Sequence, residues 1–215
     1  MNQGKEDQIV RQIFIAVGKS LGLVHLLWVG FFLTAFAEAL YFNVENWGMI
    51  PRTLEGLTGI VTMHFLHGNM THLVMNSIGI FSILIPLCFF FDEDRHMPLA
   101  IFKICIIGGI LLWLFGRPSI HIGSSLLYYG LAAYMVFGSI VHNQKGLLVY
   151  SLVSLALNST TLISGLLPTD ALVSWEGHLC GVIAGFLVAV GEKQKHDAQQ
   201  CCELKVENKN DISNP

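Results

Sequence analysis

The sequence has little charge. Lys and Arg contribute 12 residues and Asp and Glu 15, so charged side chains make up 13% of the 215 residues. Soluble globular chains carry roughly 25%. A chain with 53% hydrophobic residues and so few charges cannot cover a water-exposed surface, which excludes a disordered chain and most cytosolic enzymes. The net charge of −3 provides no basic face, so we expect no nucleic-acid partner.

Cysteine is scarce as well. The five cysteines show no disulfide framework and no zinc-ligand spacing. Cys88, Cys105 and Cys180 lie in apolar stretches, where a thiol is usually a small packing residue. Cys201 and Cys202 lie in the polar C-terminal segment, and the sequence assigns them no role. A disulfide-stabilised scaffold is therefore excluded.

Long apolar stretches take the place of charge. A bilayer requires about 17–25 residues per helix, and six segments qualify: 23–43, 67–91, 98–116, 124–141, 147–167 and 174–191. We therefore predict an all-α polytopic membrane protein, a six-helix bundle embedded in the lipid bilayer. Residues 23–191 form the predicted membrane domain. An amphipathic cytoplasmic arm over 1–22 is expected before it, and a disordered cytoplasmic tail over 192–215 after it.

The few basic residues predict the orientation. Six spans place both termini on one side, and with the N-terminus inside, the outer segments hold only Arg52 and Arg117. The inner segments hold ten basic residues, namely Lys5, Arg11, Lys19, Arg95, Lys103, Lys145, Lys193, Lys195, Lys205 and Lys209. Cytoplasmic loops are enriched in Lys and Arg. Both termini are therefore predicted to be cytoplasmic.

Three spans begin with polar clusters. The clusters are HFLHGNMTHLVMN in the second span, GSSLLYYG in the fourth and WEGHLCGVIAG in the sixth. Polar groups inside a membrane are costly and usually functional. Because these three spans all run from outside to inside, His72, Asn76, Ser125 and His178 are predicted at one depth, below the outer surface.

These residue types suit nucleophilic catalysis. A serine hydroxyl needs a base to remove its proton, and a histidine is the usual base. The tetrahedral intermediate needs hydrogen-bond donors, which His72, Asn76 and the amide of Ser125 could provide. Glu176 is close in sequence to His178, and the spans hold no other acid at that depth. We therefore expect a Ser–His dyad rather than a triad.

At this point the sequence resembles the rhomboid intramembrane serine proteases. The resemblance covers about residues 23–191 and rests on HGNMTHLVMN, GSSLLYYG and GHLCGVIAG, in the family's order and helix placement. His72 and Asn76 match a His-x-x-x-Asn pattern. Gly123 and Ser125 match the first and third positions of Gly-x-Ser-Gly, and His178 matches a histidine beside a glycine stripe.

The resemblance implies an activity and a set of roles. Ser125 would be the nucleophile and His178 the general base, with His72 and Asn76 in the oxyanion hole. Tyr129 would pack against the ring of His178, and the last supporting residue would be His67, hydrogen-bonded to the outer loop. The family cleaves transmembrane segments of other membrane proteins near the surface, without metal or cofactor. The expected partners are single-pass transmembrane substrates, and the expected location is a bacterial inner membrane.

One departure from the family pattern leaves alternatives open. Leu126 follows Ser125 where the family has glycine, and it could narrow the approach between the fourth and sixth spans. Ser124 is the alternative nucleophile, although it disturbs the register of the later Tyr129 and Gly130. A catalytically inactive relative that binds transmembrane helices is the alternative function. A third reading, a metal- or haem-binding transporter or redox protein, expects facing histidines at matching depth on both sides of the membrane.

Overall fold

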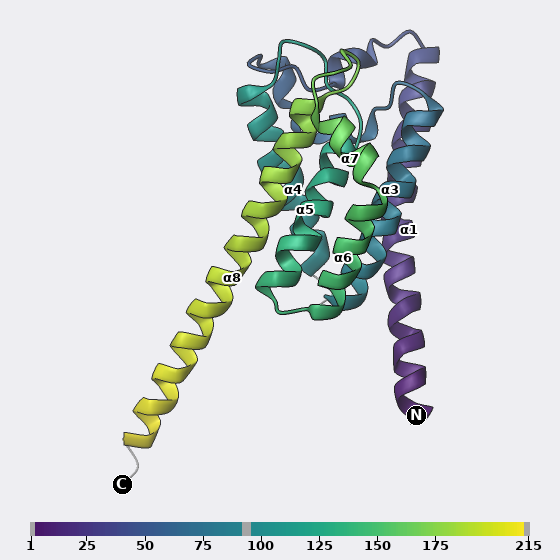
Figure 1. Cartoon of the computed structure of the whole chain (residues 1–215). Helices are drawn as coiled ribbons and strands as arrows, with labels where there is room; N and C mark the ends of the chain where they lie inside the picture. Colours follow the sequence, from purple (N-terminus) through teal and green to yellow (C-terminus); the bar gives the residue numbers. More distant parts are fainter. Residues whose placement is uncertain (1–2, 92–95, 213–215) are drawn as a thin grey trace.

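The computed structural model describes residues 3–91 and 96–212, but not the side chains of Glu45 and of residues 194–212. The long elements of this part of the chain are helices (Figure 1): α1 Gln3–Ala39, α3 Met70–Phe90, α4 His96–Phe115, α5 Ser125–Val141, α6 Lys145–Leu157, α7 Ser159–Leu166 and α8 Trp175–Ile212. Between α1 and α3 lie four short elements, η1 Val44–Trp47, η2 Glu55–Leu57, α2 Gly59–Thr62 and η3 Met63–Phe65. The predicted all-α polytopic membrane fold is confirmed.

Helices lie over the predicted spans, but the count of six spans stays a prediction. Helices α1, α3 and α4 are long and apolar enough to cross a membrane, and α5 is a shorter apolar helix of 17 residues. The predicted span 147–167 is divided into α6 and α7, which meet at a bend of 73° around Asn158. The bend turns α7 away from the axis of α6, so the fifth span is broken near the end of the bundle where the loops gather.

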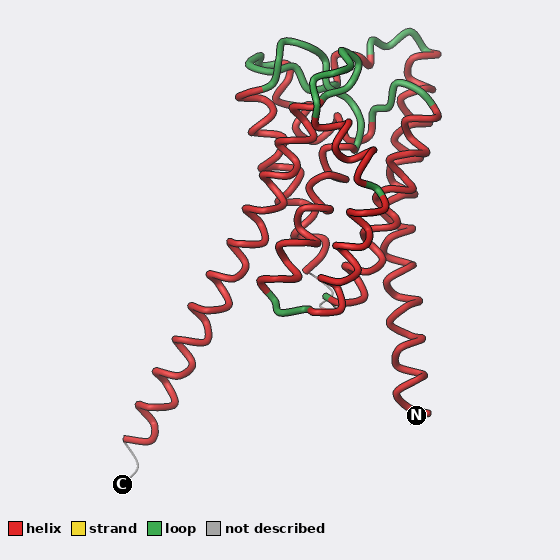
Figure 2. Tube along the Cα trace, in the orientation of Figure 1, coloured by secondary structure: helices red, strands yellow, loops and turns green. Residues whose placement is uncertain are grey.

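Both ends of the described chain lie at the same end of the bundle, as an even number of spans requires (Figure 1). Most loop segments, among them those that hold Arg52 and Arg117, gather at the opposite end (Figure 2). Arg95, which belongs to the predicted inner set, lies outside the described residues. Which end faces the cytoplasm stays a prediction.

The two ends of the chain differ from the sequence prediction. Helix α1 begins at Gln3 and continues without interruption into the first span, so the arm is not a separate surface helix. Helix α8 continues to Ile212, whereas disorder was expected from residue 192. Beyond Gly191 the helical segment contains no Pro or Gly and is rich in Lys, Glu and Gln, which favour helix. Residues 213–215 lie outside the described residues.

Helix α5 lies at the centre of the bundle and packs most extensively against α8. A glycine stripe on α8 permits this contact. A Cβ atom at Gly181 would collide with the carbonyl oxygen of Leu126, and one at Gly185 with that of Gly130. Small residues let helix backbones approach closely where the surrounding lipid is as apolar as the helices. The backbones of α5 and α8 therefore touch along the stripe.

We predict that Gly185→Ala destabilises the bundle, because one methyl group must separate two backbones in contact. Overpacking of this kind costs roughly 1–3 kcal/mol. The control is Gly22→Ala on α1, where an added Cβ meets nothing within 4 Å. Thermal unfolding in detergent micelles should show a lower transition temperature for Gly185→Ala alone. Equal transitions for Gly185→Ala and the parent would contradict the packing argument.

Candidate active site

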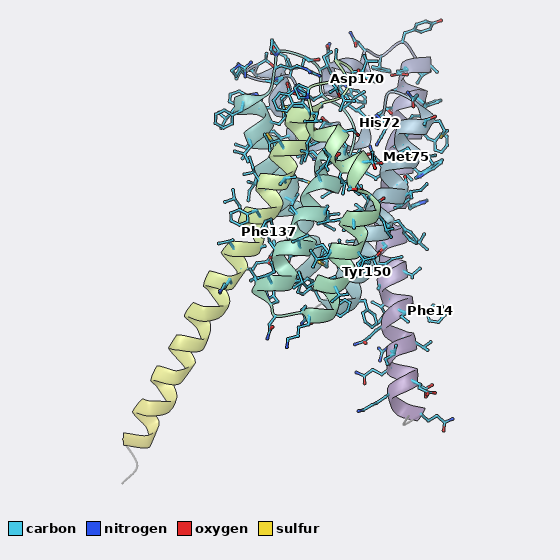
Figure 3. The ribbon with its side chains drawn as sticks, in the orientation of Figure 1. Phe14, His72, Met75, Phe137, Tyr150 and Asp170 are labelled. Atoms are coloured by element: carbon cyan, nitrogen blue, oxygen red, sulfur yellow. The ribbon has the colours of Figure 1, made fainter. Side chains whose placement is uncertain are left out.

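The packing of α5 on α8 brings Ser125 and His178 together. Ser125 is the first residue of α5, and His178 lies in the first turn of α8. The distance between Ser125 Oγ and His178 Nε2 is 3.0 Å. Both residues lie at the starts of their helices, which follow loop segments that gather at one end of the bundle (Figure 2), the end at which Figure 3 labels Asp170. The two residues predicted as a dyad are therefore in hydrogen-bonding contact.

A backbone carbonyl fixes the protonation of His178. His178 Nδ1 lies 2.6 Å from the carbonyl oxygen of Gly165 in α7. A carbonyl oxygen can only accept, so Nδ1 carries the proton and donates it. In the neutral imidazole Nε2 is then the acceptor, and the hydroxyl of Ser125 donates to it. The hydrogen bonds thus orient the ring as a base toward Ser125 without a carboxylate.

Tyr129 holds the imidazole from one side. Its ring stacks on that of His178 with centroids 4.2 Å apart and an angle of 10° between planes. The hydroxyl of Tyr129 donates to the carbonyl oxygen of Leu162 at 3.1 Å, which ties α5 to α7. A Cβ at Gly165 would collide with this hydroxyl and lie 3.1 Å from His178 Nδ1. Gly165 therefore has to be a glycine for α7 to approach the ring. Nothing in the sequence marks this glycine as part of the site.

His72 and Asn76 lie beside the segment that precedes Ser125. Asn69 caps α3 by accepting a hydrogen bond from the backbone N–H of His72 at 2.9 Å. Gly123 has φ of 107°, and a Cβ there would lie 2.7 Å from His72 Nε2 and 3.5 Å from Asn76 Nδ2. Asn76 is buried, and its Nδ2 has no hydrogen-bond partner within the described part of the chain. A buried amide donor without a partner is costly unless a ligand or a reaction intermediate uses it.

Ser124 and His67 form a different contact. Ser124 is fully buried, and its Oγ lies 3.3 Å from His67 Nε2 rather than beside His178. The ring of His67 also meets that of His72 edge to face, with centroids 5.1 Å apart. His67 thus joins the chain before α5 to the segment before α3, and its expected hydrogen bond to the outer loop stays a prediction.

Leu126 points away from the dyad. Its side chain is buried with Met49, Met63, Leu112 and Cys180 in a small apolar cluster beneath the loops. Gly108 of α4 provides the space, because a Cβ there would lie 2.7 Å from Leu126 Cδ2. The atom of Leu126 nearest to an added Cβ at Gly181 is its backbone carbonyl oxygen, so the close contact with α8 at Gly181 is made by the backbone.

A second network positions the chain that enters α8. Arg117 Nε lies 3.6 Å from Glu176 Oε1, and Arg117 Nη2 donates to the carbonyl oxygens of Ala171 and Val173, each at 2.8 Å. Glu176 therefore pairs with Arg117 and does not orient His178. The sequence placed Arg117 in a short connection and gave no signal for this long-range contact.

The loop histidines beside the site are neutral at pH 7. Complete burial lowers the pKa of His64 to about 4. Burial is also the main cause that lowers the pKa of His121, whose Nδ1 lies 2.6 Å from Ser174 Oγ. These two rings therefore add no positive charge to the loop end of the bundle.

Comparison with known proteins agrees with this geometry. A family model, the Rhomboid domain, matches residues 54–194, which include every site residue named above. An uncharacterized protein of Mycobacterium tuberculosis is 35% identical over 152 residues, 66% of this chain and 62% of its own length. Another, of Mycobacterium leprae, is 33% identical over 159 residues, 68% of this chain and 61% of its own.

A protein of Acanthamoeba polyphaga mimivirus with a provisional rhomboid name is 32% identical over 133 residues, 59% of this chain and 70% of its own length. The chain spans less than two thirds of the length of the mycobacterial relatives. The family model nevertheless covers more than half of the chain, with the dyad inside the matched region. This polytopic helical membrane protein therefore belongs to the rhomboid family.

Proposed function

We propose that this protein is an intramembrane serine endopeptidase that cleaves transmembrane segments of other membrane proteins near the outer surface. One observation carries the proposal, the chain of contacts from Ser125 Oγ to His178 Nε2 and from His178 Nδ1 to the carbonyl oxygen of Gly165. Its donor and acceptor directions are those that a serine nucleophile and a histidine base require.

In the proposed reaction, Nε2 takes the hydroxyl proton as Oγ attacks the carbonyl carbon of the scissile peptide bond. The resulting oxyanion accepts hydrogen bonds from Asn76, from His72 and from the backbone N–H of Ser125. That N–H is the first of α5 and has no acceptor within the helix. His178 then gives its proton to the amine as the C–N bond breaks. A water molecule, deprotonated by His178, hydrolyses the acyl-enzyme and frees Oγ.

The position of the dyad defines the proposed substrate. The pair lies near the end of the bundle opposite the termini, so a substrate helix must expose a peptide bond close to that surface. We assign this end to the outside and both termini to the cytoplasm, because the basic residues cluster with the termini. Two mycobacterial relatives support a bacterial inner membrane as the location. Single-pass transmembrane proteins are the proposed substrates.

The dyad is tested with the purified protein in liposomes and single-span substrates whose helix is weakened near the outer surface. Ser125→Ala and His178→Ala should each abolish cleavage, because the nucleophile or its base is lost. The matched control is Ser124→Ala, which should still cleave because Ser124 contacts His67 instead. Cleavage is measured by gel analysis of the two products.

Two outcomes would contradict the assignment. Cleavage by Ser125→Ala at the parent's rate, together with loss in Ser124→Ala, would move the nucleophile to Ser124. No cleavage of any substrate by the parent, with substrate binding retained, would establish the inactive helix-binding relative instead.

Gly165→Ala tests the orientation of the base. The added methyl collides with the hydroxyl of Tyr129 and crowds His178 Nδ1, so the imidazole has to move. Misplacement by about 1 Å can cost roughly 10²-fold in rate, and we expect at least about tenfold in kcat/KM. Adding Tyr129→Phe removes the colliding hydroxyl and should recover part of the loss. Unchanged kinetics in Gly165→Ala would show that the carbonyl contact does not position the ring.

Leu126→Gly tests whether the departure from the family pattern limits the enzyme. It removes a side chain that fills the cluster beside Gly108, so the unfolding free energy should fall by about 2–5 kcal/mol. Leu126→Gly should not cleave substrates faster than the parent, because the side chain of Leu126 does not face the dyad. The control is Leu114→Ala on α4, where the side chain is exposed. A large gain in rate would mean that Leu126 does obstruct the substrate.

A further inference from the structure

A second polar cluster lies at the opposite end of the bundle from the dyad. It consists of His96 at the start of α4, His142 at the C-cap of α5, and Glu192, which follows the apolar stretch of α8. Among the residues that the structure describes, this is the one group of three or more His, Cys, Asp or Glu side chains that could hold a metal ion. Its ligand atoms all lie within 4.8 Å of one another.

The distances suit a tetrahedral metal ion. Glu192 Oε2 lies 3.4 Å from His96 Nε2 and 3.7 Å from His142 Nε2. Zinc bonds to histidine nitrogen and carboxylate oxygen measure about 2.0–2.1 Å, which places neighbouring tetrahedral ligands about 3.4 Å apart. The remaining pair of ligand atoms, on the two imidazoles, lies within 4.8 Å, so the rings have to close around the ion as it binds.

Aromatic rings hold the two imidazoles in place. Phe91 stacks on His96 with centroids 5.1 Å apart, and it meets His142 edge to face, also at 5.1 Å. His142 Nε2 faces Glu192 Oε2 at 3.7 Å and has no closer polar partner in the described part of the chain, so a metal at this nitrogen would replace that ion-pair contact. The side chains of His96, His142 and Glu192 are 18%, 22% and 11% exposed, so none of the three is fully enclosed.

Tyr134 and Lys103 complete the surroundings. The hydroxyl of Tyr134 donates to Glu192 Oε2 at 2.6 Å and lies 2.6 Å from His96 Nε2. Before His96 Nε2 can bind a metal, it has to lose its proton and its hydrogen bond with the hydroxyl of Tyr134. Lys103 donates to the other carboxylate oxygen, Oε1, at 3.2 Å. The ammonium group orients the carboxylate, but its positive charge also repels a bound cation. The affinity of the site for a metal ion is therefore lower than it would be with an uncharged residue in place of Lys103.

We propose that His96, His142 and Glu192 form a binding site for a divalent transition-metal ion of the zinc class, with water in the fourth position. The site joins α4, α5 and α8 at the end that carries both termini. Helices α5 and α8 carry Ser125 and His178 at their other ends, so the bound ion fastens together the two helices that hold the dyad. The metal takes no part in cleavage, and the site is independent of the proposed protease activity.

The test uses the full chain without a polyhistidine tag, in detergent micelles and freed of metal with a chelator. Co²⁺ is added first, because tetrahedral and octahedral cobalt have visible bands of very different intensity, and Zn²⁺ should then displace it. Zn²⁺ should also raise the unfolding temperature in a concentration-dependent manner, since it binds only the folded chain. Cys201→Ser with Cys202→Ser provides the background in which every variant is compared.

His142→Ala is the decisive variant, because it removes one ligand and leaves the contacts among His96, Tyr134 and Glu192 in place. Losing even a second-shell partner costs roughly 10–100-fold in metal affinity, so at least about tenfold weaker binding is expected. Lys103→Met should tighten binding. The control is His25→Ala, an exposed histidine on α1, which should bind as the parent does.

Three results would overturn the proposal. Octahedral cobalt bands only, or tetrahedral bands that persist in His142→Ala, would place the metal elsewhere. The third result is that the cluster binds protons and not metal. The unfolding temperature would then depend on pH in the parent but not in His142→Ala, and it would not change when Zn²⁺ is added.

Discussion

The backbone contact between α5 and α8 is the constraint on which the rest of the structure depends. Gly181 and Gly185 let the carbonyls of Leu126 and Gly130 approach α8 at a distance that no larger residue permits. Because helices are stiff, this contact also fixes how side chains farther along α5 lie relative to side chains of α8. At one end it sets the 3.0 Å separation of Ser125 and His178, and at the other it brings His142 to Glu192.

His178 is oriented by a backbone carbonyl and not by a carboxylate. Burying a charged carboxylate in the bilayer costs free energy. A backbone carbonyl carries no net charge and can accept a hydrogen bond from the imidazole with a free lone pair. The bend between α6 and α7 brings the carbonyl of Gly165 to the imidazole, and Tyr129 bonds to α7 while it stacks on the ring. In the proposed reaction, the broken fifth span thus supplies the acceptor for His178 Nδ1, where a catalytic triad has a third side chain.

Part of this arrangement could be predicted from the sequence, because polar residues are rare in membrane-spanning segments and therefore easy to recognise. Ser125, His178, His72 and Asn76 interrupt apolar helices, and helix direction alone placed them at one depth. The contacts of Gly165 and Arg117 could not be predicted, since a carbonyl acceptor has no residue signature and Arg117 joins loops far apart in sequence. The place of the Leu126 side chain could not be predicted either, because Gly108, which makes room for it, lies on another helix.

The sequence by itself determined the solvent and the helical, polytopic class of the fold, because these follow from local hydropathy, whereas the six spans and the roles of the polar residues stay predictions. It did not determine the bend at Asn158 or the continuous helices that begin at Gln3 and end at Ile212. Only the tertiary structure joined His96, His142 and Glu192, which come from three helices and share no spacing. Such groupings depend on how helices pack, and packing is decided by contacts between residues distant along the chain.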